Sequence, residues 1–89
     1  MAEPVLPELE YPALYVFRAV ARRAPDASSR VRRHVEAVLG PLPDDAVTEK
    51  DSSRGTYLAV HVTCLLQDEA QRRDVYARLK ADAGVLFTL

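Results

Sequence analysis

The residues best suited to chemistry in this 89-residue chain are His34, His61 and the single cysteine, Cys64. Imidazole and thiolate groups bind zinc and also form nucleophile–base pairs. The spacing argues against both uses, because His34 falls on a predicted helix, while His61 and Cys64 are three residues apart on a predicted strand and so face opposite sides of it. We therefore expect no metal site, no cofactor and no catalytic residue, and interpret these side chains as surface histidines and a buried thiol.

A second candidate is the segment from Lys50 to Tyr57, KDSSRGTY. Gly55 suits the positive-φ position of a hairpin, and serine side chains bond nearby backbone amides in such turns. The same hydroxyls and amides could cradle an anion beside the lysine and arginine, as backbone nests do. The simple turn is the favoured interpretation, and the candidate ligand- or partner-binding residues are Arg18, Lys50, Ser52, Ser53, Arg54, Gly55, Tyr57 and His61.

The run Arg54-Gly55-Thr56-Tyr57 is similar to the start of an RNA-recognition signature, in which aromatic residues stack bases on a sheet. Here the aromatic residue lies one position out of phase. The 12 basic and 13 acidic side chains also nearly cancel, so no whole-protein field attracts nucleic acid. We expect no nucleic-acid binding, and keep an RNA-binding module as an alternative.

A run of cations occurs in the first half of the chain: Arg22, Arg23, Arg30, Arg32 and Arg33. This run is either a patch for an acidic partner or the solvated side of a helix.

These residues must be positioned by strands and helices that the hydrophobic periodicity predicts in the order strand, helix, strand, strand, helix, strand. The six predicted elements span 12–23, 26–39, 46–51, 56–66, 68–83 and 85–89. This order is the split βαβ pattern of ferredoxin-like α+β domains, in which two helices cover one face of a four-stranded antiparallel sheet. We expect residues 1–10 to form a flexible lead-in and residues 11–89 to form a single domain.

The two helices have recognisable starts and apolar sides. Asp26 and Asp68 are the predicted N-caps, since a carboxylate there accepts from the free amides of the first turn. Val31 and Val35 mark the apolar stripe of the first helix, whereas Arg72 is predicted on the solvated side of the second.

The face of the sheet opposite the helices should be open, and alternation along the strands predicts its composition. With Tyr15, Phe17 and Ala19 directed inward, the outward set contains Arg18, Tyr57, His61, Thr63 and Thr88. It also contains aliphatic residues that exceed scattered exposure and predict an interface with a second copy or another protein: Leu14, Val16, Val20, Leu65 and Leu86.

The lone cysteine excludes an internal disulfide and fits a reducing compartment. The N-terminal segment lacks the pattern of a secretion signal, and the apolar runs are far shorter than the roughly 20 residues that span a bilayer. We expect a cytoplasmic protein that does not enter the membrane.

Several residues resemble one family: Tyr11-Pro12 and Phe17-Arg18 in the first strand, the turn Ser52 to Tyr57, and Tyr76, Leu79, Val85 and Leu89. The sequence resembles the YbeD family of small bacterial proteins of unknown function. That family is ferredoxin-like and similar to regulatory ACT domains, so the resemblance implies a binding or regulatory module with a small-molecule effector or a protein partner. The loop 22–28 lacks the glycine that ACT-type effector loops use. The main alternative is a small acylphosphatase-type hydrolase, although loop 22–28 offers no counterpart of its anion loop.

Overall fold

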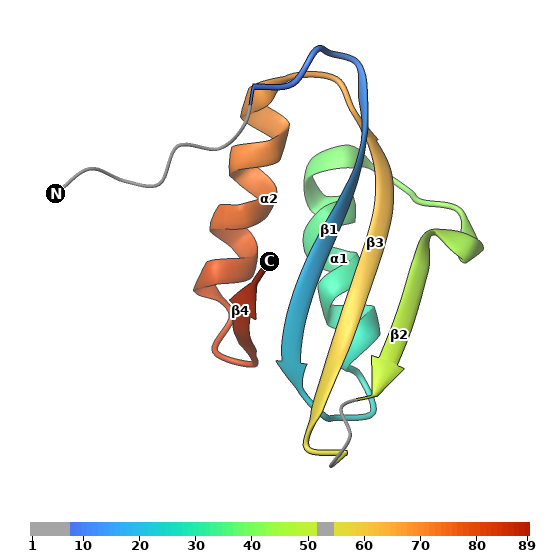
Figure 1. Cartoon of the computed structure of the whole chain (residues 1–89), viewed down its shortest axis with the longest axis vertical. Helices are drawn as coiled ribbons and strands as arrows, with labels where there is room; N and C mark the ends of the chain where they lie inside the picture. Colours follow the sequence, from blue (N-terminus) through green and yellow to red (C-terminus); the bar gives the residue numbers. More distant parts are fainter. Residues whose placement is uncertain (1–7, 52–54) are drawn as a thin grey trace, which may run out of the picture.

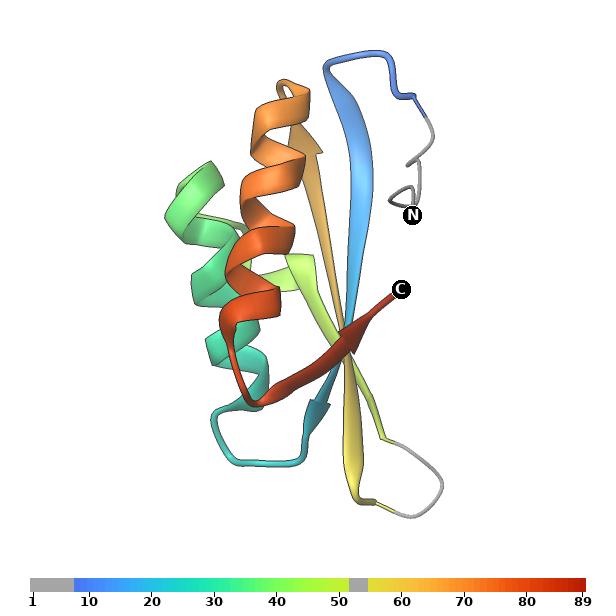
Figure 2. The same cartoon turned by 90° about the vertical axis from the view of Figure 1, so that its left-hand side faces the viewer.

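A computed structural model describes residues 8–51 and 55–89 of the chain, and Figure 1 shows its elements. They are β1 (Ala13–Arg22), α1 (Ala27–Leu39), a 3-10 turn η1 (Asp44–Ala46), β2 (Val47–Asp51), β3 (Tyr57–Leu66), α2 (Glu69–Ala81) and β4 (Val85–Thr88). The strands form a four-stranded antiparallel sheet in the order β2-β3-β1-β4. Both helices lie on the same side of this sheet (Figure 2). The predicted ferredoxin-like α+β fold is confirmed.

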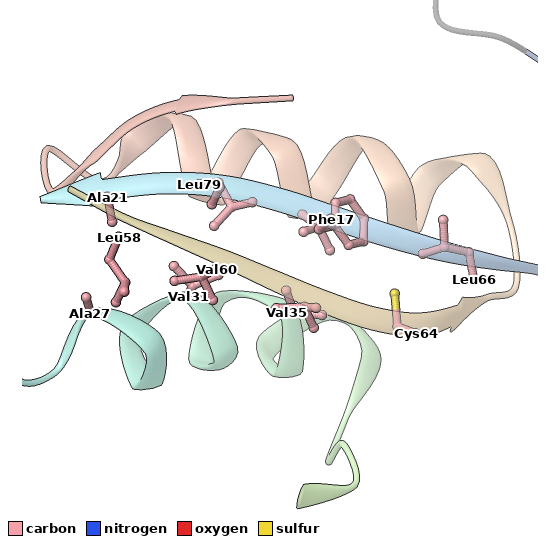
Figure 3. Close-up of a cluster of buried hydrophobic side chains, with 13 residues drawn as sticks. Phe17, Ala21, Ala27, Val31, Val35, Leu58, Val60, Cys64, Leu66 and Leu79 are labelled. Carbon is pink, nitrogen blue, oxygen red and sulfur yellow. The ribbon is translucent and has the colours of Figure 1, made fainter. Parts of the chain in front are cut away.

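The central pair of strands organises the core. β1 and β3 pair without interruption from Ala13 opposite Leu66 to Arg22 opposite Tyr57. Their alternate side chains meet the inner sides of both helices, as Figure 3 shows for Phe17 and its neighbours. The fully buried large side chains are Phe17, Val31, Val35, Val60, Val62, Leu66, Val75 and Leu79. The inward direction predicted for alternate residues of β1 and for the stripe of α1 is therefore confirmed.

The two predicted helix caps have different outcomes. Asp68 caps α2, because its Oδ1 accepts a hydrogen bond of 2.9 Å from the amide of Gln71. Asp26 stands at the N-cap position of α1, as predicted, but the hydrogen bond predicted between its carboxylate and the first turn is absent. Its backbone is at φ −104° and ψ 10°, rather than in the extended conformation from which a cap side chain reaches the first amides.

Candidate functional site

The exposed large apolar side chains of the described residues lie on the strands or directly after β4, and none of them lies on a helix. The six large ones are Leu14, Tyr57, Leu65, Leu86, Phe87 and Leu89. Leu14 is 79% exposed and Phe87 is 52% exposed, so a large part of each side chain is in contact with water. Scattered apolar residues are normal on protein surfaces, but a group on one sheet face indicates a binding surface.

Strand register arranges these residues in rows across the sheet face that the helices leave bare. The rows are Leu65 with Leu14; Thr63 with Val16; Thr48, His61 and Arg18; Lys50, Ala59, Val20 and Phe87; and Tyr57 with Arg22. Together with Leu86 and Leu89 we call this surface the open face. It has an apolar end, a polar middle row and a second apolar area beside β4.

A shallow groove of about 560 Å³ lies in the second apolar area. It is lined by Val20, Lys50, Asp51, Tyr57, Ala59, Leu86 and Phe87. Its volume falls within the range of small-molecule sites, and its walls are mainly apolar. Two charged side chains from the end of β2 line the groove, Lys50 and Asp51, and the second of them pairs with Arg23.

The last strand departs from simple alternation. Thr88 pairs with Ala19, whose side chain is buried, so its prediction on the open face was wrong. Phe87 instead pairs with Val20, and the register shifts between Val20 and Ala21, so that Leu86 and Phe87 both line the groove. In a β-bulge, two consecutive residues of one strand lie opposite a single residue of its partner. β4 has only four residues, so its sequence contains no periodic pattern from which this register shift could be predicted.

The candidate binding residues fall into three groups. Arg18 and Lys50 are exposed on the open face, where His61 lies opposite Arg18. Gly55 has the positive φ predicted for it, at 68°, and its carbonyl accepts from Arg23 Nε at 2.6 Å. Ser52, Ser53 and Arg54 lie outside the described residues, so the anion-cradle hypothesis stays a prediction.

The predicted interface residues also differ in exposure. Leu14, Leu65 and Leu86 are exposed, while Val16 and Val20 are half-buried between their neighbours on the sheet. All five lie on the open face, and their role in binding stays a prediction.

Most of the basic run in the first half of the chain is engaged within the molecule. Arg23 pairs with Asp51, and Arg30 pairs with Asp82. Arg32 contacts Glu36 at 3.4 Å and donates to a backbone carbonyl. These cations hold the fold together, which argues against a single basic patch on α1.

Arg72 is buried, with 3% of its surface exposed, and its predicted place on the solvated side of α2 was wrong. Its Nε and Nη2 donate to Oε1 of Glu69 at 3.1 and 3.0 Å, and its guanidinium lies 5.7 Å from the ring centroid of Tyr15. The hydroxyl of Tyr11 donates to the other oxygen of Glu69. Hydrogen bonds from Tyr11 and Arg72 lower the pKa of the Glu69 carboxyl. This cluster fastens the chain before β1 to the start of α2.

A pair of tyrosines continues this cluster toward the core. The hydroxyls of Tyr15 and Tyr76 are 2.5 Å apart, and both rings pack edge to face with Phe17. Burial, reinforced by the Tyr15 hydroxyl, raises the pKa of Tyr76. Both tyrosines pack against the hydrophobic core and neither lines the groove of the open face, so we assign them a structural role.

A second buried charge cluster surrounds Asp82, just after α2. Its carboxylate accepts from Arg30, from His34 Nε2 at 2.8 Å and from the amide of Gly84 at 2.8 Å. The His34 hydrogen bond, opposed by desolvation, lowers the pKa of Asp82. His34 is therefore not a surface histidine, and its partner was missed because it lies 48 residues away in sequence.

Cys64 is buried, as predicted, and the remaining chemistry-bearing residues do not converge with it. Burial raises the pKa of its thiol to about 11, so little thiolate exists at neutral pH. No group of three or more metal-binding side chains occurs in residues 8–51 and 55–89. No helix in those ranges is long and apolar enough to cross a membrane.

Comparison with known proteins places these features in a family. A solved structure, the solution structure of protein HP0495 from H. pylori, matches with a TM-score of 0.73 at 18% identity and covers 94% of this chain and 88% of that one. A UPF0250 protein of Shewanella sediminis is 35% identical over 79 residues, which are 86% of this chain and 85% of that protein. A family model described as Protein of unknown function (DUF493) matches residues 7–89. The chain therefore belongs to the DUF493 family, which is the YbeD family that its sequence resembles.

Proposed function

We propose that this protein is a non-catalytic binding module that recognises another protein through the open face. The observation that carries the proposal is the gathering of all six exposed large apolar side chains of the described residues on the strands and the residue after β4. Solvent contact with such a surface is unfavourable, and a docked partner removes it from water.

The groups with shifted pKa values support binding over catalysis. Glu69, Tyr76 and Asp82 are engaged in hydrogen bonds that hold elements of the fold together, and Cys64 is in the core. None of them lines the groove of the open face. An active site instead brings perturbed groups together in a cleft that a substrate can enter.

The groove supports a second, smaller role. Its volume of about 560 Å³ and its apolar walls suit a small-molecule effector that would bind beside the protein partner and regulate it. A thermal-shift screen with amino acids, nucleotides and cofactors tests this role, because a ligand that binds the native state raises its melting temperature.

Paired variants test the main proposal. Leu65→Ser with Phe87→Ser removes apolar surface from both apolar areas of the open face, while Lys80→Ser alters an exposed position of α2 as a matched control. Each protein is used as bait, and any captured protein is purified and its affinity for each bait measured by calorimetry. We expect the double variant alone to lose binding. Equal affinity of all three baits would contradict the proposal.

A further inference from the structure

The open face is cationic as well as apolar. Arg18, Arg22 and Lys50 are exposed on it, and none of them has a carboxylate within ion-pair distance among the described residues. Asp51 lines the groove, but its carboxylate already pairs with Arg23. Among the described residues, the surface thus presents three unpaired positive charges between apolar areas, and the carboxylate that lines its groove is already neutralised by a partner.

This charge pattern argues against a second copy as the occupant. A two-fold symmetric dimer brings the same patch of both subunits together. Stacking two open faces would enclose Arg18, Arg22 and Lys50 of both copies in one interface, and like charges gathered in an interface oppose binding. The homodimer predicted from the apolar residues alone is therefore disfavoured on this face.

The distribution of aromatic residues argues against RNA. Single-stranded RNA stacks its bases on aromatic side chains at the centre of a sheet of this type. The central positions of β1 and β3 carry Arg18 and His61, while Tyr57 and Phe87 lie in the rows toward the far end of the sheet. The exposed leucines offer no stacking surface to a base.

We infer that the open face docks an acidic amphipathic helix of a partner protein. The inference rests on the proposed function and specifies its partner. Arg18 and Arg22 are four residues apart on β1, which is about 13 Å at the rise of a strand. A helix rises about 1.5 Å per residue, so carboxylates about two turns apart reach both cations. Aliphatic residues between those turns lie over Val20 and Phe87, which are neighbours in the row between the cations.

Two synthetic helical peptides of identical leucine pattern test this inference. One carries glutamates on its polar face, and the other carries lysines at the same positions. Each is titrated into the ¹⁵N-labelled full chain at low salt, and amide shifts are followed by NMR. We expect the glutamate peptide to shift open-face amides and to bind about tenfold more tightly than the lysine peptide, since each rim ion pair adds a modest factor. Salt should weaken the complex.

Charge-reversal variants separate this inference from the proposed function. Arg18→Glu with Lys50→Glu should reverse the preference between the peptides, whereas Arg33→Glu, at an exposed position of α1, should leave it unchanged. Equal affinity for both peptides, or no shift at millimolar concentration, would overturn the acidic helix. Sedimentation equilibrium of the wild type and of Leu65→Ser with Phe87→Ser tests for self-association. A wild-type dimer that is lost in this double variant would overturn the acidic helix in favour of a second copy, with the open face still the interface. Shifts confined to the helices would overturn both proposals.

Discussion

Replacing Asp82 with asparagine should destabilise the fold. The Asp82 carboxylate joins α1 to the connection between α2 and β4, because it accepts from two side chains of α1 and from the amide of Gly84. The exposed fraction of its side chain is only 7%. Asparagine keeps the shape and one acceptor oxygen, but it loses the negative charge and turns an NH₂ group toward one of the donors.

The size of the effect follows from the three contacts. Breaking a buried ion pair by removing one charge costs about 3–5 kcal/mol in the free energy of unfolding. Here the Arg30 side chain is 38% exposed and can turn partly to water, which reduces the expected loss to about 2–3 kcal/mol. For a domain of this length that loss corresponds to a fall of about 10–20 °C in melting temperature.

The assay is urea and thermal unfolding of both proteins followed by far-UV circular dichroism across a range of pH. Since the folded-state pKa of Asp82 is lowered, the stability it contributes is complete above its unfolded pKa of about 4 and disappears as the pH falls through the folded value. The gap between wild type and Asp82→Asn should therefore be widest at neutral pH and should close in acid. Asp74→Asn, at an exposed position of α2, is the control. A neutral-pH loss no larger than that of the control would refute the reasoning.

Three further outcomes are expected from single sites. Cys64, with a thiol pKa of about 11, should react with iodoacetamide at pH 8 far more slowly in the native protein than in urea; equal rates would show that the thiol is accessible. Gly40→Ala should lower the free energy of unfolding in urea by about 1–3 kcal/mol, because its backbone angles of φ 85° and ψ −176° suit glycine alone. An added Cβ would have no neighbour within 4 Å, so the loss would come from backbone strain and not from a clash. Tyr76→Phe should cost about 1 kcal/mol by leaving the Tyr15 hydroxyl without its partner, and an unchanged melting temperature would show that this hydrogen bond adds nothing.

The architecture was predictable because its signals are local and periodic. Strict alternation along β3 directs Leu58, Val60, Val62 and Leu66 to the side opposite Tyr57, His61, Thr63 and Leu65, and all four are buried. The Asp68 cap was predictable for the same reason, since its acceptor and donor lie three residues apart. Ferredoxin-like topology then follows from the order of the elements.

The buried charges were not predictable, because they depend on pairs that only the fold brings together. Arg72 looks like a solvated position on α2, yet Glu69 and the Tyr15 ring enclose it. Pairing of His34 with Asp82 likewise requires the middle of α1 to meet the end of α2. On the open face, sequence reasoning identified the aliphatic residues but missed Phe87, because the register shift opposite it leaves no local trace.

The strand order has a consequence for how the domain folds. β2 and β1 both pair with β3 and not with each other, so the segment from β1 through β2 contains no strand pair of its own. The partners of β1, which are β3 and β4, both come later in the chain than β2, so β1 stays unpaired until a long loop closes, which slows folding relative to a helical bundle of equal size. Native-state hydrogen exchange should therefore find the central amides of β1 and β3 opening together, in one global event.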